Sequence, residues 1–331
     1  RDMEFIAWAP LAVSETNVVL PIGLLADGAT IHHSNGTPIE VDLTADTTAL
    51  ATAIGATSDA VLDARNMGES SVWWTQTFEL VSQRLGIDMK KQTVPINPRV
   101  ATTIGGIATD EHGRAITGRW SRWFTGLYAA GDSACSGLHG AGLIAGNRLL
   151  DSMAGGAAAG EHAANYAAKT SHTGRATLEI ALGAAEADLD FDMAGADEGP
   201  VQRTGPLFAK LGEIMQSSMG NSRDAQGLEN AMESLELLAE SAGKLHLDDS
   251  SRLFNTNLLE ALRLKAGVRL AQAAVRSAIS RTESRGTHQR TDFAEQDDEQ
   301  LHHTLIDIHG NLSTLAIRKG TSGTWVLSPN E

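Results

Sequence analysis

The sequence predicts an α+β fold, in which short strands and glycine-rich loops come first and a group of helices follows. Residues 1 to about 93 mix short apolar runs with a helical pattern, and residues 94–165 are dense in glycine. From Pro206 onward, apolar residues recur at helical spacing. The tail, residues 301–326, alternates enough to predict a short hairpin around Gly310.

Composition limits the possible classes of protein. With 331 residues the chain has room for about two domains. Because 42% of the residues are hydrophobic and 20% charged, wholesale disorder is excluded. The formal net charge of −15 argues against nucleic acid or an anionic lipid surface as the main partner. Cys135 is the only cysteine, so no intramolecular disulfide and no cysteine zinc cage can form.

The first region predicts strands at residues 3–8, 18–24 and 39–43 and a helix over residues 72–85. The Ala- and Thr-rich tract 44–58 fits either a helix or a loop.

Two further segments separate the glycine-dense region from the helices. Residues 149–168 are rich in alanine, which predicts a buried, closely packed helix. Residues 184–204 are polar and acidic, as a linker would be. Beyond them, residues 255–284 could form a helix of about 30 residues.

The strongest local signal is the run Thr125–Asp132, in which a small apolar strand ends in Gly131-Asp132. At the carboxyl edge of a sheet, a glycine lets the backbone approach a ligand, and a carboxylate can bind a ribose-type hydroxyl. The alternative is a strand that ends in an ordinary turn.

A second glycine-rich segment, Gly140–Ala145, has the letters of a dinucleotide-binding fingerprint. The strand that should precede it directly is replaced by a loop, and the nearest acidic residue is Asp151. We therefore interpret the segment as the approach to a helix that begins near Asn147, whose amides would face a negative or carbonyl-bearing ligand.

No metal site is predicted. The pairs at residues 32–33 and 302–303 are histidines, but adjacent residues point in different directions and no cysteine or carboxylate spacing completes a site. We expect these histidines at the surface. Cys135 has His139 four residues on, but a small buried cysteine is the simpler interpretation.

Several motifs together resemble the flavoprotein subunits of succinate dehydrogenase and fumarate reductase. The opening Arg1–Phe5 is similar to the family's strand that enters its capping domain, and Thr103–Thr109 to the segment that returns from it. Gly126–Asp132 and Gly137–Asn147 are similar to its second flavin-contacting stretch. Parts of the helical domain follow in order, and L-aspartate oxidases share part of the pattern. The helical-domain motifs are Phe254–Leu259, Glu283–Arg290, Asp297-Asp298 and His303–Leu305.

The resemblance implies a partial FAD-binding domain with a reduced capping domain, then a helical bundle domain and a short C-terminal β segment. It also implies that the family's N-terminal Rossmann half, with its phosphate loop, has no counterpart here, so that FAD would be shared with that half or with another chain. The implied domains are an FAD-domain strand at 1–10, the capping domain at 11–93, the returning half of the FAD-binding domain at 94–168, a linker at 169–204, the helical domain at 205–290 and the C-terminal segment at 291–331.

At the positions where the resemblance implies dicarboxylate chemistry, this sequence has other residues. The family's two substrate histidines correspond to Trp8 and Ala101, and its clamping arginine to Leu143. No arginine stands near the expected proton-transfer position, and Arg65 is the nearest. No catalytic residue is therefore assigned, and succinate is not expected as the substrate.

The flavin-facing positions are better kept. The resemblance implies that Gly131 and Asp132 contact FAD, with Asp132 on its ribose hydroxyls. Arg148 and Leu149 take the place of a Ser-Leu pair whose amides face the flavin ring. Arg148 would either add positive charge beside the ring or turn to solvent or a salt bridge. Gly105 and Gly106 complete the predicted cofactor-binding set.

Three functions follow from the resemblance. The first is part of an FAD-dependent oxidoreductase that transfers electrons between a substrate and an iron–sulfur partner. The second is a pseudoenzyme kept as a scaffold in a respiratory complex, and the third is an L-aspartate-oxidase-like enzyme. The implied partners are an iron–sulfur subunit and a chain supplying the N-terminal flavin domain. The implied location is peripheral, on the cytoplasmic face of a membrane or in the mitochondrial matrix, reaching the membrane through partner subunits.

Overall fold

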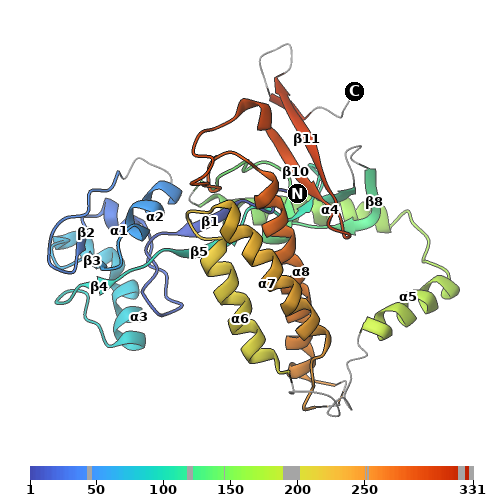
Figure 1. The fold of residues 1–331 in the computed structure, drawn as a ribbon, viewed down its shortest axis with the longest axis horizontal. Helices are drawn as coiled ribbons and strands as arrows, with labels where there is room; N and C mark the ends of the chain where they lie inside the picture. The colour runs from blue at the N-terminus through green and yellow to red at the C-terminus, as the bar shows by residue number, and fades with distance from the viewer. Residues whose placement is uncertain are drawn as a thin grey trace.

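The computed structural model describes residues 1–42, 47–117, 122–144, 146–188, 202–249, 251, 253–319 and 325–327. It confirms the α+β class: a mixed lobe, a central region of short strands, a helical bundle and a C-terminal hairpin follow one another along the chain (Figure 1). The strands form small separate sheets rather than one large sheet.

The first lobe, drawn in blue in Figure 1, has its own hydrophobic core, whose members run from Leu11 to Ile96. Its central sheet has the strand order β2-β3-β4 and is antiparallel. Its elements are α1 (Gly23–Ala26), β2 (Thr30–His33), α2 (Thr47–Gly55), β3 (Ala60–Asp63), a 3-10 helix (Gly68–Trp74), α3 (Thr75–Leu85) and β4 (Val94–Pro95).

Only some of the elements predicted for this lobe are found in the structure. The helix predicted over residues 72–85 is found as the end of the 3-10 helix followed by α3, which stops at Gly86 with a positive φ of 69°. The strand predicted at 18–24 is wrong, because Pro21 has no N–H to donate to a ladder and α1 begins two residues later. Residues 39–42 form no strand, and residue 43 lies outside the described residues.

Two antiparallel strands, β1 (Ile6–Ala9) and β5 (Arg99–Thr103), connect this lobe to the centre of the molecule (Figure 1). They pair from Ile6 with Thr103 to Ala9 with Arg99, and the register shifts between Ala7 and Trp8. The remaining central strands are β6 (Ile107–Ala108), β7 (Arg114–Thr117), β8 (Arg122–Tyr128) and β9 (Ala134–Cys135).

Three long helices form the bundle: α6 (Thr204–Ser218), α7 (Ala225–Gly243) and α8 (Thr256–Ser280). Their shared core includes Leu228, Leu235 and Leu264, all fully buried. Side-chain caps fix two of the helix starts, because Asp224 accepts from the N–H of Gly227 and Asn255 from that of Leu258. Helix α8 is shorter than the predicted 30 residues and ends where Arg281 takes an extended conformation.

Two helices precede the bundle, α4 (Asn147–Ala167) and α5 (Arg175–Asp188). The prediction of a buried α4 is wrong: among its described side chains only Ala159 is buried. Alanine content predicts a helix but not which element covers it, and no described element covers most of α4. Helix α5 lies within the implied linker 169–204 and overlaps the start of the acidic stretch 184–204, while residues 189–201 lie outside the described residues.

The predicted C-terminal hairpin is confirmed. Strands β10 (His302–Ile306) and β11 (Leu312–Lys319) pair antiparallel around a turn that contains Gly310, and β12 (Trp325–Leu327) pairs with β11. None of the helices in the described ranges has the length and apolar character needed to cross a membrane.

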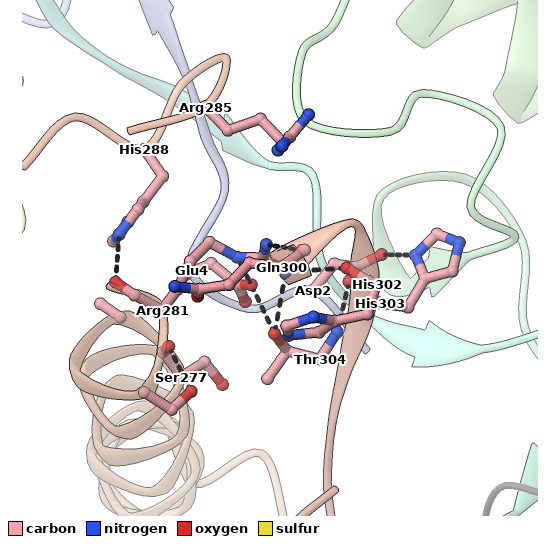
Figure 2. A network of polar contacts seen from close by, with 12 residues as sticks. Asp2, Glu4, Ser277, Arg281, Arg285, His288, Gln300, His302, His303 and Thr304 are labelled. Carbon is pink, nitrogen blue, oxygen red and sulfur yellow. Dashed lines mark hydrogen bonds and ion pairs between the residues drawn. The ribbon is translucent and has the colours of Figure 1, made fainter. Parts of the chain in front are cut away.

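A buried polar network joins the first residues to the bundle and the hairpin (Figure 2). The Asp2 carboxylate lies 2.5 Å from Nδ1 of His303, and Glu4 accepts from Arg281 and Thr304, both at 2.7 Å. The expectation that the histidines at 302–303 lie at the surface is therefore wrong for His303, which is buried. Burial raises the pKa of Glu4, although the charge of Arg281 opposes this.

A neighbouring buried histidine makes stability depend on pH. Nδ1 of His288 accepts from Arg223 at 2.8 Å, so the proton of the neutral ring sits on Nε2 and points to the carbonyl of Arg281, 3.3 Å away. Burial, reinforced by the positive charge of Arg223, lowers the pKa of His288 to about 3. The folded protein thus keeps this ring neutral at pH values where the unfolded chain protonates it.

We therefore expect the contribution of His288 to the free energy of unfolding to be fully present above about pH 6.5. As the pH falls toward about 3, this contribution should be lost by up to about 1.4 kcal/mol per pH unit. Urea unfolding between about pH 7 and 4 should show a shallower pH slope in His288→Gln than in the wild type, with His309→Gln, an exposed site, as control. Equal slopes in all three proteins would contradict this origin of the pH dependence.

Candidate functional site

The site begins where β8 ends. The strand predicted before Gly131-Asp132 is β8, and the two residues open a 3-10 turn, Gly131–Ser133. Gly131 has a positive φ of 62°, and a Cβ there would lie 3.0 Å from Oγ of Ser152 on α4. Glycine at this position therefore lets the turn lie close to α4, which brings Asp132 next to that helix.

Gly105 and Gly106 serve chain packing in this region. A Cβ at Gly105 would lie 2.4 Å from the carbonyl oxygen of Asp2, and one at Gly106 would lie 2.8 Å from that of Ser133. The close approach lets β6 pair in parallel with β9 and keeps the turn around Asp132 in place. Their predicted cofactor contact stays a prediction.

Residues that follow helix α8 contact the loop between β9 and α4. The N–H of Thr287 donates to the carbonyl of Ala141 at 2.8 Å, and a Cβ at Gly286 would lie 2.2 Å from the same oxygen. His303 lies against Gly137, where a Cβ would come within 3.0 Å of its ring. Gly286, Thr287 and His303 therefore hold this loop in place, and His303 also belongs to the buried network of Figure 2.

The outer side of the same loop is open. A Cβ at Gly140, Gly142 or Gly146 would meet no atom within 4 Å. Helix α4 starts at the predicted Asn147, and its N-cap residue Gly146 supplies no side-chain acceptor for the first turn. The helix start therefore presents backbone N–H groups and the positive end of the helix dipole toward an open surface.

Asp132 and Arg148 meet across this surface. Nε of Arg148 donates to Oδ1 of Asp132 at 2.8 Å and to Oδ2 at 3.0 Å, and Nη2 also contacts Oδ2. The hydrogen bonds from Arg148 hold the pKa of Asp132 below its usual range. Of the two orientations left open for Arg148, the structure contains the salt bridge. Leu149, next to it, is exposed.

Two small cavities lie in this region: one of about 20 Å³ is lined by Asp132 and Arg148, and one of about 10 Å³ lies beside Cys135 and Gly137. Each has room for about one water molecule. His139 and Asp151 line both cavities, with Nε2 of His139 3.5 Å from Oδ2 of Asp151. The sequence did not predict this pair. Its one sequence signal is the position of Asp151 in the first turns of α4.

Cys135 is buried, as predicted, and its thiol is 3.7 Å from a carboxylate oxygen of Asp2. Burial raises the pKa of this thiol to about 12, so it is not a nucleophile at neutral pH. Within the described ranges, no three histidine, cysteine or acidic side chains gather as a metal site.

The positions where dicarboxylate-binding residues were sought carry apolar side chains. Leu143 packs against a small core of Phe5, Ala7 and Ile104. Trp8 is buried, whereas Ala101 is exposed on β5. Leu143 thus packs on hydrocarbon at one side, and at the other it lines the 20 Å³ cavity with Asp132 and Arg148.

Arg65, the nearest arginine to the position expected for proton transfer, is engaged elsewhere. It lies in the first lobe and donates to both carboxylate oxygens of Asp63, at 2.9 and 2.7 Å.

Comparison with known families gives two matches along the chain. A model described as "FAD binding domain" matches residues 1–149, and one described as "Fumarate reductase flavoprotein C-term" matches residues 208–327. The first covers Gly131, Asp132 and Arg148, and the second covers the bundle except the start of α6, together with the C-terminal strands β10, β11 and β12.

Individual relatives agree with these matches. The fumarate reductase flavoprotein subunit of Mycobacterium tuberculosis is 34% identical over 74% of this chain and 42% of its own length. The succinate dehydrogenase flavoprotein subunit of Coxiella burnetii is 34% identical over 71% of this chain and 40% of its own length. A solved structure of a quinol fumarate reductase variant from E. coli superposes with a TM-score of 0.83 at 25% identity, over all of this chain and 60% of that one. The chain thus spans about two-fifths of the length of these two curated relatives.

Proposed function

Because this chain belongs to the family of fumarate reductase and succinate dehydrogenase flavoprotein subunits, whose cofactor is FAD, we propose that it is part of an FAD-dependent oxidoreductase. We infer further that it transfers electrons between an iron–sulfur partner and a substrate other than succinate or fumarate. The observation that carries the proposal is the open helix start of α4 beside Asp132, within the segment that matches the FAD-binding model.

The described residues fit one side of a flavin. The Asp132 carboxylate is about half exposed and can accept hydrogen bonds from ribose-type hydroxyls. The backbone N–H groups at the start of α4 can donate to a carbonyl edge, and the open glycines of the preceding loop let a flat ring approach. FAD, when bound, supplies the hydride and electron chemistry. The chain orients it and stabilises negative charge at the helix start.

The apolar side chain of Leu143, at the position of the family's clamping arginine, supports a substrate other than a dicarboxylate. Two carboxylates need cationic, preferably bidentate, partners to hold them and to stabilise developing charge. Leu143 offers no cation, Arg148 in the same cavity is paired with Asp132, and Arg65 is paired with Asp63.

The face formed by β8 and α4 supports contact with a further flavin-binding segment or chain. On these two elements and in the loop before α4, large apolar side chains are at least 40% exposed, which is typical of an interaction surface. They are Phe124, Leu127, Leu138, Ile144, Leu149, Leu150 and Met153. We propose that the rest of the flavin site packs here, that an iron–sulfur subunit docks on the helical bundle, and that any membrane association is indirect.

A scaffold without redox activity is the second candidate, and the apolar replacement at Leu143 favours it as well. The visible spectrum of the protein purified from its native host with its partners separates the two. We expect a flavin band that dithionite bleaches and succinate does not. A colourless complex would favour the scaffold, whereas bleaching by succinate would show that the substrate has not changed.

A further inference from the structure

Arg148 donates hydrogen bonds to Asp132, whose carboxylate the proposed function assigns to flavin binding. The guanidinium of Arg148 contacts both oxygens of Asp132, with Nε at 2.8 and 3.0 Å. Both side chains line the 20 Å³ cavity at this point. The guanidinium therefore takes up acceptor positions on both carboxylate oxygens, and a ribose hydroxyl can use those positions only after the guanidinium has moved.

We propose that Arg148 competes with FAD for Asp132, so that the flavin-free protein keeps this carboxylate paired and flavin binding must open the ion pair. This inference rests on the proposed function, in which Asp132 is a flavin contact. Arg148 is then a residue that sets flavin affinity, not one that holds the flavin.

The exposure of the pair allows such an exchange. The side chains of Arg148 and Asp132 are 50% and 46% exposed, so water can solvate the guanidinium once it leaves. Exposed ion pairs contribute little to stability, and opening one should weaken FAD binding by only about two- to fivefold. The pair therefore lowers flavin affinity without preventing binding.

A double-mutant cycle on FAD affinity tests the competition. The protein, with its partner subunits, is produced under riboflavin limitation and titrated with FAD while flavin fluorescence is followed. Arg148→Ala should tighten binding by about two- to fivefold. Asp132→Ala should weaken it, and adding Arg148→Ala to Asp132→Ala should change nothing further. Arg175→Ala removes an arginine on α5 that is also ion-paired, with Glu179, and is more exposed than Arg148; it should have no effect.

Each alternative outcome has a distinct meaning. Weaker binding by Arg148→Ala would show that Arg148 holds the flavin itself, and unchanged binding would show that the pair does not compete. Either result, with Asp132→Ala still weakening binding, overturns the competition but leaves the proposed function standing. If no variant binds FAD, or if Asp132→Ala binds it normally, the assignment of Asp132 to the flavin fails and the competition with it.

Discussion

Replacing Arg281 with alanine is expected to lower the free energy of unfolding by about 3–5 kcal/mol, since removing one partner of a buried ion pair leaves the other charge unpaired. The Arg281 side chain is 1% exposed and donates to Glu4, Glu283 and Thr304 as well as to two backbone carbonyls. Its removal would leave the fully buried Glu4 without its ion-pair partner, whereas Glu283 would keep Arg285.

Urea unfolding of the full protein measures this effect, and Arg269→Ala is the matched control. Arg269 is an exposed arginine on the same helix, α8, so its removal should change stability by no more than about 0.5 kcal/mol. Similar losses in the two variants would mean that the buried network contributes no more than a surface charge does.

Replacing Gly286 with alanine is expected to cost about 2–5 kcal/mol and to release flavin from the assembled protein. Gly286 has a positive φ of 54°, which strains any side chain, and the new Cβ would lie 2.2 Å from the carbonyl oxygen of Ala141. Relieving that clash must shift the loop that leads to Asn147, and with it the helix start that faces the flavin.

Thermal unfolding and flavin content after gel filtration measure the two effects together. Gly212→Ala provides the control, because Gly212 is exposed within α6 and a Cβ there meets no atom within 4 Å. Alanine at that position should stabilise the helix by about 0.5–1 kcal/mol and leave flavin content unchanged. Flavin retention in Gly286→Ala would separate this loop from the cofactor site.

Local patterns predicted the site where it depends on neighbouring residues. The strand that ends at Gly131-Asp132 and the helix start at Asn147 follow from glycine placement and apolar runs, and both are confirmed. The sequence does not show why residue 105 must be glycine, because the reason is the close approach of the Asp2 backbone.

Long-range contacts set the rest. His303 was expected at the surface because nothing near it in sequence pairs with it, while its partner Asp2 lies 301 residues away. The exposure of α4 was missed for a similar reason, since composition cannot indicate whether another element covers a helix. Likewise, whether Arg148 would turn toward Asp132 depends on how closely β8 approaches α4, and the spacing of 16 residues leaves that open.

Because Asp2 and Glu4 pair with Arg281 and His303, this part of the molecule can complete its folding only late in synthesis. At about 5–20 residues per second, a ribosome needs on the order of 15–60 s between adding Asp2 and adding His303. The first lobe can fold around its own core in that interval, but the two carboxylates must stay hydrated until the last helix and hairpin emerge. The high contact order of this centre makes its closure a late, slow step, and nascent chains halted before Arg281 should be the ones that chaperones retain.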